Sequence, residues 1–178
     1  MATTALVPVS EYLSSSYEVD CDYVDGELQE RNMGEWQHGY LQLLLGRMTG
    51  NREIEWGVKA ATEVRVQVRT DRYRIPDLCV LRITDPVHRI VRKAPLICVE
   101  VLSPEDRWQR MLDRVGDYHQ MGVANVWILD PFQKKAWVAL PDGTQQSVAD
   151  ALTVPGTDIR IPIDELWSAL DRMQAAQH

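Results

Sequence analysis

The chain has 178 residues, of which 45% are hydrophobic and 25% are charged, a composition typical of a globular protein with a sizeable core. Its formal net charge of −7 argues against a protein that coats nucleic acid without specificity, because phosphate neutralisation by cations drives such binding. No apolar run is long enough to span a bilayer, and residues 1–5 lack the basic-then-apolar pattern of a signal peptide. We therefore expect a single domain over residues 1–178, located in the cytoplasm and not associated with a membrane.

The first part of the chain predicts short elements. Residues 10–13 are expected to form a short helix. Residues 17–31 are expected to form two strands joined at Asp25-Gly26, a dipeptide typical of a tight hairpin turn. Glu27 follows this turn, and its expected place is a solvated strand face.

A longer helix is predicted to begin at Asn32 or Gly34 and to end near Met48. Its predicted apolar stripe consists of Trp36, Tyr40, Leu43, Leu44 and Met48. Glu35 and His38 lie three residues apart on a different face. A carboxylate and an imidazole there could supply a metal ligand or a general base, or the face could simply be solvated, and periodicity leaves both open.

Three strands are predicted next, over residues 54–59, 62–69 and 75–81. The middle segment alternates apolar and polar residues, which indicates a strand with one buried face. Short turns between these segments predict that they form an antiparallel meander.

Two apolar runs each carry one carboxylate. Asp77 precedes the run 78–81, and Glu100 follows the run 96–99. A buried carboxylate is costly unless it is paired or binds a metal. If the two strands are neighbours, Asp77 and Glu100 can meet at one sheet edge, and such a pair of oxygen donors suits Mg²⁺. The alternative is structural, since Pro-Asp is common at strand starts and Glu100 could mark the strand leaving the core.

A second long helix follows. The segment 103–106 is typical of a helix start, and Gly122 is placed to end the helix. Its predicted core face consists of Trp108, Met111, Leu112, Val115 and Tyr118. On another face Arg107, Arg110 and Arg114 recur at helical spacing. They could reach phosphates or pair with neighbouring aspartates; we favour salt bridges for Arg107 and Arg110 and leave Arg114 open.

The remaining chain predicts further sheet. Residues 123–130 form a buried strand, which makes a parallel strand–helix–strand unit with the preceding strand and helix. A strand over 135–140 and a final amphipathic helix from Pro162 complete the prediction. Cys79 and Cys98 lie inside apolar runs and are expected to be buried free thiols.

Several blocks of the chain resemble a known nuclease family. They are Pro76-Asp77, Glu100-Val101-Leu102-Ser103-Pro104, and the pattern of Tyr118, Gly122-Val123, Val126-Trp127 and Asp130-Pro131. In combination they resemble the Uma-type restriction endonuclease family, a branch of the PD-(D/E)xK nuclease superfamily, over roughly residues 17–138. The opening 24–28, followed by a helix bearing His38, is similar to that family too.

This resemblance implies a restriction endonuclease-like α/β fold, with a central mixed β-sheet flanked by helices. It also implies Mg²⁺- or Mn²⁺-dependent hydrolysis of phosphodiester bonds in DNA, with Asp77 and Glu100 as the metal ligands. An acidic residue on the first long helix often completes such sites, which implies a role for Glu35, while His38 and Glu27 are weaker candidates. The resemblance and the symmetry of duplex DNA together imply a homodimer.

One departure from the family pattern affects the expected activity. The superfamily places a lysine two residues after the glutamate, where this chain has Leu102, and this branch commonly places it fourteen residues after, where the chain has Arg114. Arginine can hold a phosphate through two hydrogen bonds, but it stays protonated and cannot act as a base. Arg114 therefore either supplies the electrostatic part of catalysis, or the protein is a weakened or inactive nuclease fold that serves as a dimeric binding module. A hydrolase of a small phosphorylated substrate is a third reading.

Overall fold

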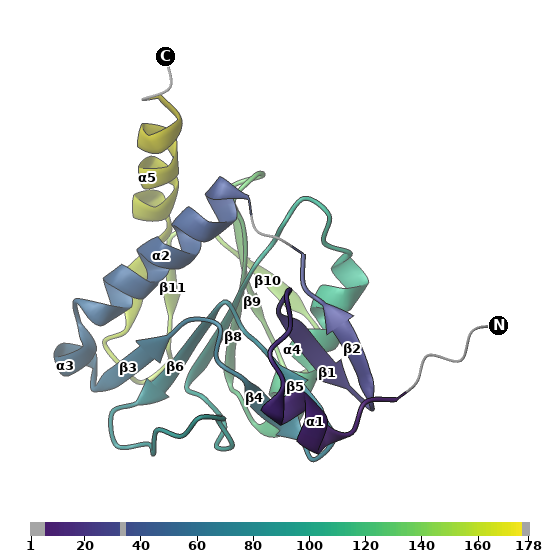
Figure 1. Cartoon of the computed structure of the whole chain (residues 1–178). Helices are drawn as coiled ribbons and strands as arrows, with labels where there is room; N and C mark the ends of the chain where they lie inside the picture. Colours follow the sequence, from purple (N-terminus) through teal and green to yellow (C-terminus); the bar gives the residue numbers. More distant parts are fainter. Residues whose placement is uncertain (1–5, 33–34, 176–178) are drawn as a thin grey trace.

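Figure 1 shows the structure, a computed structural model that describes residues 6–32 and 35–175. The helices are α1 (Val9–Ser14), α2 (Trp36–Gly50), α3 (Glu53–Trp56), α4 (Trp108–Met121) and α5 (Ile163–Ala175). The first six strands are β1 (Cys21–Val24), β2 (Glu27–Glu30), β3 (Val58–Ala61), β4 (Val66–Arg69), β5 (Arg72–Arg74) and β6 (Leu78–Arg82). The later strands are β7 (Ile97–Val101), β8 (Asn125–Asp130), β9 (Lys135–Ala139), β10 (Gln145–Val148), β11 (Ala151–Thr153) and β12 (Arg160–Pro162). Within the described ranges, no helix is long and apolar enough to cross a bilayer.

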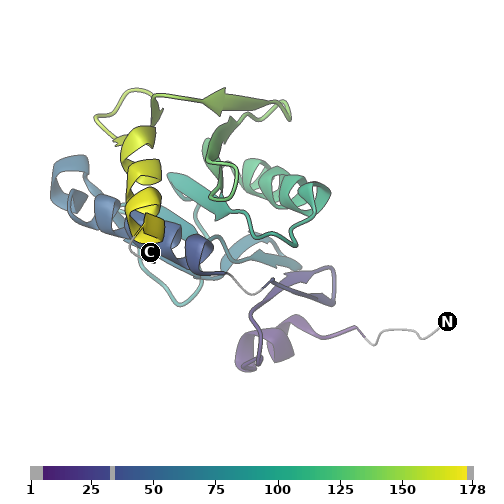
Figure 2. The same cartoon turned by 90° about the horizontal axis from the view of Figure 1, so that it is seen from above.

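The larger sheet is mixed, with the strand order β10-β9-β8-β7-β6-β3. Strands β7 and β8 run parallel and are connected through α4, whereas the other neighbouring pairs are antiparallel. Viewed from above, α2 and α5 lie on one side of this sheet and α4 lies on the other (Figure 2). The predicted parallel strand–helix–strand unit and the predicted mixed sheet flanked by helices are therefore confirmed.

The central strands of the larger sheet are buried on both faces. Strands β7 and β8 are buried along their whole length, which explains why they are near-continuous apolar runs rather than alternating ones. On one face, Leu41 of α2 and Leu166 of α5 belong to the same apolar cluster as Val99. On the other face, Met111 of α4 belongs to a second cluster with Cys98. The free thiols predicted in the apolar runs are buried as expected.

A smaller antiparallel sheet of strand order β2-β1-β5-β4 lies beside α4. Tyr23 and Tyr73 of this sheet form a cluster with Tyr12 of α1, whose hydroxyl donates a hydrogen bond to the Cys21 carbonyl oxygen at 3.0 Å. This smaller sheet supplies several residues of the candidate site.

The predicted antiparallel meander over residues 54–81 is wrong. Residues 53–56 form α3, which ends at Gly57 with a left-handed φ of 62°. Strand β3 then pairs with β6 in the larger sheet, whereas β4 pairs with β5 in the smaller one. Between β3 and β4 the chain passes through Glu63, whose φ of 53° interrupts the extended backbone and separates the two strands.

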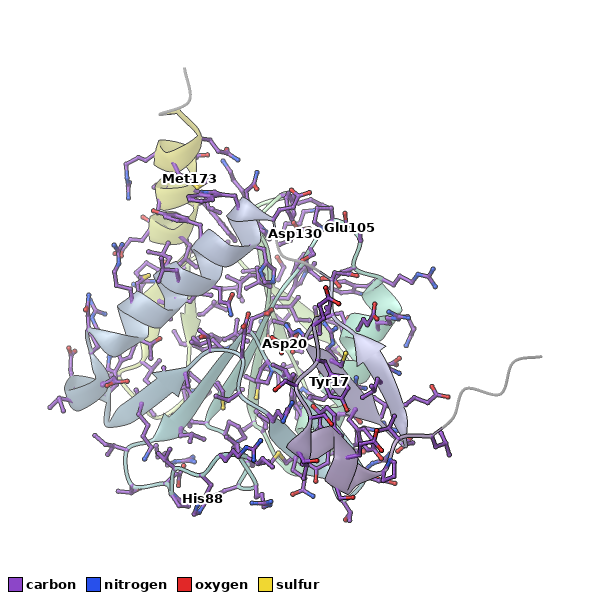
Figure 3. All side chains as sticks on the ribbon, viewed as in Figure 1. Tyr17, Asp20, His88, Glu105, Asp130 and Met173 are labelled. Carbon is purple, nitrogen blue, oxygen red and sulfur yellow. The ribbon has the colours of Figure 1, made fainter. Side chains whose placement is uncertain are left out.

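The apolar stripe predicted for α2 is partly wrong. Trp36 and Leu43 are 70% and 68% exposed, although the Trp36 indole contacts the sulfur of Met173 on α5 (Figure 3). The buried face instead contains His38 and Leu41. Apolar residues occur all around this helix, so periodicity alone selects the wrong side, and the structure turns His38 inward.

Helix α4 begins later than predicted. The Asp106 carboxylate accepts a hydrogen bond from the Ser103 amide at 2.7 Å, so residues 103–106 form a turn ahead of the helix. Trp108, predicted in the core, is 40% exposed and packs edge-on against Trp137, with ring centroids 5.5 Å apart. Gly122 ends the helix as predicted, with a left-handed φ of 101°.

Candidate active site

Asp77 and Glu100 lie opposite each other on neighbouring antiparallel strands. Leu78 of β6 pairs with Val99 of β7, so continuing this register by one residue places Asp77 across from Glu100. Paired residues of an antiparallel ladder project from the same face of the sheet. Asp77 is 1% exposed and Glu100 is 0% exposed, so the two carboxylates come together inside the protein, as the sequence predicts for neighbouring strands.

The Asp77 carboxylate has several close donors. Its Oδ1 accepts a hydrogen bond from Arg31 Nη2 at 2.5 Å and lies 3.5 Å from His38 Nε2, while its Oδ2 accepts one from the Val101 amide at 2.6 Å. Burial raises the pKa of Asp77, but the His38 hydrogen bond, the Arg31 charge and the Val101 amide outweigh it and hold that pKa below its usual value. Asp77 is therefore held as a carboxylate.

Glu100 has a different environment. Its Oε1 accepts a hydrogen bond from the Tyr118 hydroxyl at 2.5 Å, and its Oε2 accepts one from Arg114 Nη1 at 3.3 Å. Burial raises the pKa of Glu100 to about 7; the Arg114 charge opposes this rise, and the nearby Asp77 charge adds to it. The two facing carboxyl groups thus have pKa values that are displaced in opposite directions, which is a common property of functional sites.

Arg114 connects Glu100 to a buried chain of charges. Its Nε donates to Asp22 Oδ2 at 3.1 Å, and the same Asp22 oxygen accepts a hydrogen bond from Arg74 Nη1 at 2.9 Å. Arg74 continues the chain, because its Nε donates to Asp117 Oδ2 at 2.7 Å. Alternating charges of this kind fix the position of each side chain, since every buried charge has an oppositely charged neighbour.

Four residues near the two carboxylates were not predicted to belong to the site: Asp22, Arg31, Arg74 and Tyr118, the last of which was predicted only as a core residue. Tyr118 had a detectable signal, because it follows Arg114 by one helical turn and therefore shares its face. Asp22, Arg31 and Arg74 come from or adjoin the smaller sheet, and no local pattern indicates how that sheet docks.

The structure places His38, but not Glu35, next to Asp77. Glu35 is the N-cap residue of α2 and is exposed, and in the described part of the chain no hydrogen bond links it to Asp77 or Glu100. The predicted helix start at Gly34 lies outside the described residues. Glu27 is likewise exposed in β2, and the ion pairs among the described residues do not include it.

The salt bridges favoured for Arg107 and Arg110 are not formed in the described part of the chain. Both side chains are exposed, and neither belongs to an ion pair within residues 6–32 and 35–175. Asp113 instead accepts a hydrogen bond from Gln109 at 3.0 Å, and Asp117 pairs with the arginines of β5. Neither Asp113 nor Asp117 therefore pairs with Arg107 or Arg110, and both guanidinium groups are exposed to solvent.

Asp77 and Glu100 offer carboxylate oxygens, which are suitable ligands for Mg²⁺, but they are only two residues. No group of three or more His, Cys, Asp or Glu side chains suited to a metal occurs among the described residues. Mg²⁺ commonly needs only one or two carboxylates and completes its shell with waters and phosphate oxygens. Because Arg31 and Arg114 already donate to these carboxylates, a cation would compete with them for the same oxygens.

Comparisons with known proteins agree with this fold. A family model described as "Uma2: Putative restriction endonuclease" matches residues 9–165. A crystal structure of a "putative nuclease belonging to DUF820" from Anabaena variabilis ATCC 29413 is similar with a TM-score of 0.79 and 20% identity, covering 90% of this chain and 97% of that one. This similarity shows that the two share a fold.

A second solved structure, a cryo-EM structure of a DrdV–DNA complex, is similar with a TM-score of 0.43 and 10% identity, over 76% of this chain and 11% of that one. This similarity is too weak to locate a site. The search of curated proteins gave no match. Since the family model covers most of its length, the chain belongs to the Uma2 family, and it has the restriction endonuclease-like fold predicted from its sequence.

Proposed function

We propose that this protein is a single-domain, Mg²⁺- or Mn²⁺-dependent endonuclease that hydrolyses phosphodiester bonds in DNA. The observation that carries the proposal is the buried pair Asp77 and Glu100, which face each other from neighbouring strands in a chain of a nuclease family. Membership of that family supports hydrolysis of a nucleic acid, and the two carboxylates are the residues that would hold the cation.

A divalent cation bound by these carboxylates would polarise the scissile phosphate and lower the pKa of a bound water. The protein's own contribution is to position charge. Asp77 is kept ionised by His38, Arg31 and the Val101 amide, so its carboxylate can serve as an anionic ligand. Glu100 is the carboxylate whose charge depends on its surroundings, because burial raises its pKa into the neutral range.

Two arginines supply the positive side of the site. Arg114 stays protonated, so its role is to donate hydrogen bonds to phosphate oxygens and to stabilise the negative charge that grows on them, not to remove a proton. Arg31 supports the same role, because its Nη1 is buried and has no hydrogen-bond partner among the described residues. A phosphate oxygen would satisfy this donor. A role for Glu35 remains a prediction.

The alternative is a catalytically weakened or inactive nuclease fold that acts as a dimeric binding module. Two observations favour it: Leu102 occupies the place of the superfamily lysine, and arginine N–H groups already satisfy both carboxylates. Because Arg31 and Arg114 already compensate the charges of Asp77 and Glu100, the fold does not need a metal ion for its stability.

Cleavage of supercoiled plasmid DNA tests the proposal. We expect nicked and linear products with Mg²⁺ or Mn²⁺ and none with EDTA, for the wild type and for Asp158→Asn, an exposed matched control. Asp77→Asn should abolish the products. Absence of products under all conditions, together with a well-folded protein, would favour the inactive reading. Equal cleavage by Asp77→Asn would exclude this site as their source.

A further inference from the structure

A separate cleft lies between the smaller sheet and α4. It has a volume of about 490 Å³ and is open to solvent. Five of the chain's 19 lysine and arginine residues line it: Arg69, Arg72, Arg74, Arg110 and Arg114. Three carboxylates, Glu30, Asp113 and Asp117, line it as well, so the cationic side chains outnumber the anionic ones. Such a concentration of guanidinium groups is notable in a chain with a net charge of −7, and it indicates an anionic ligand.

The arginines at the floor of the cleft are held rigidly by the protein. Arg74 is 3% exposed and is fixed by Asp22 and Asp117. Arg114 is fixed by Asp22 and Glu100. These pairs neutralise much of the positive charge, but they also remove the entropic cost of ordering long side chains when a ligand binds.

Two arginine N–H donors in the cleft have no acceptor among the described residues. Arg72 Nε is buried and lacks a hydrogen-bond partner among the described residues, although its Nη1 donates to Asp117 at 2.8 Å. Arg114 uses its Nε and Nη1, and within the described ranges its Nη2 donates to no protein group. A buried donor without a partner is costly, and an anionic oxygen in the cleft would remove that cost.

Two more arginines lie at the rim of the cleft, one on α4 and one on the smaller sheet. Arg110 projects from α4, is exposed, and forms no ion pair with any described residue. Arg69 ends β4 and keeps a partly exposed side chain that pairs with Asp25 at 2.9 Å. Tetrahedral phosphate groups suit this arrangement, because planar guanidinium forks can donate two hydrogen bonds to one phosphate from either side.

We propose that this cleft binds the backbone phosphates of the DNA strand that enters the active site. The proposal rests on the proposed function, and it adds the path of the substrate. Arg114 joins the two sites, because it lines the cleft and also donates to Glu100. Phosphate contacts carry no base information, so the cleft binds strands of any sequence and positions them relative to Asp77 and Glu100.

Fluorescence anisotropy with a labelled duplex oligonucleotide tests the cleft without cleavage, since EDTA is present. Two single variants, Arg69→Gln and Arg110→Gln, each remove one guanidinium charge, from opposite walls of the cleft. Arg107→Gln is the matched control, because Arg107 has the same charge at the start of the same helix but does not line the cleft. We expect each cleft variant to weaken binding by roughly tenfold at low salt and to reduce the log–log salt slope by about one, for unrelated sequences alike.

Several outcomes would overturn the cleft proposal. Equal affinities for Arg110→Gln and Arg107→Gln would show that the cleft does not hold the strand, as would absence of wild-type binding at low salt. Stabilisation by inorganic phosphate without oligonucleotide binding would reduce the cleft to a small-anion site. None of these results depends on the metal site, which the plasmid assay with Asp77→Asn tests separately.

Discussion

Replacing Glu100 with glutamine should stabilise the metal-free protein relative to wild type, and this stabilisation should grow as the pH rises. The folded-state pKa of Glu100 is raised from 4.5 to about 7 by burial, so the folded protein holds a proton that the unfolded chain has already released across this range. Wild-type stability therefore decreases as the pH rises from about 4.5 to about 7. Each pKa unit corresponds to 1.36 kcal/mol, so the loss reaches about 3 kcal/mol.

Glu100→Gln cannot lose this proton, and its single amide oxygen keeps an acceptor for one of the two donors, Tyr118 or Arg114. The free energy of unfolding of the variant, relative to wild type, should increase by about 2.5 kcal/mol from about pH 5 to about pH 8. Urea unfolding in EDTA, followed by tryptophan fluorescence, measures this difference. Taking the difference at each pH removes the contributions of groups that both proteins share, such as His38.

The matched control is Glu105→Gln, the same chemical change at an exposed residue of the segment leading into α4 (Figure 3). This control isolates the effect of replacing a carboxylate with an amide at a solvated position. A stability difference for Glu100→Gln that stays constant from about pH 5 to about pH 8 would contradict this prediction, because it would mean that Glu100 titrates alike in the folded and unfolded states.

Further predictions concern the neighbours of the two carboxylates. Arg31→Met should lower the free energy of unfolding of the metal-free protein by about 3–5 kcal/mol, because Asp77 loses a partner inside the protein. The same variant should gain more thermal stability from Mn²⁺ than wild type does, measured by scanning calorimetry, since the competing guanidinium is gone; an unchanged gain would mean that Arg31 does not compete. Tyr118→Phe should cost about 1–3 kcal/mol at about pH 8 and less at about pH 5, because the hydroxyl mainly stabilises ionised Glu100. A pH-independent cost, measured by urea unfolding, would contradict that role.

Parts of the fold were predictable because their signals are local. The apolar runs before and after α4 indicate strands buried on both faces, and the left-handed position of Gly122 suits the end of a helix. The separation of β3 from β4 was not predictable. It depends on the backbone turn at Glu63 and on pairing with strands distant in the sequence, neither of which alternation reveals.

Some residues of the candidate site were likewise predictable from the sequence, and others were not. Asp77 and Glu100 stand out because a carboxylate beside an apolar run needs a reason to be buried. Whether Glu35 or His38 lies next to Asp77 depends on where α2 begins and on which of its sides is buried. Neither can be predicted from the sequence, because apolar residues occur all around that helix. Asp22 and Arg31 reach the site only because the smaller sheet packs beside α4, a tertiary arrangement without a sequence signature.

Calorimetric titration of Mn²⁺ tests whether Asp77 and Glu100 together hold a divalent cation. We expect saturable binding to wild type and to the exposed-site control Asp158→Asn, with a rise in melting temperature, and loss of both effects in Asp77→Asn and Glu100→Gln. Equal binding by Asp77→Asn, or no saturable binding to wild type at millimolar Mn²⁺ with or without duplex DNA, would contradict it.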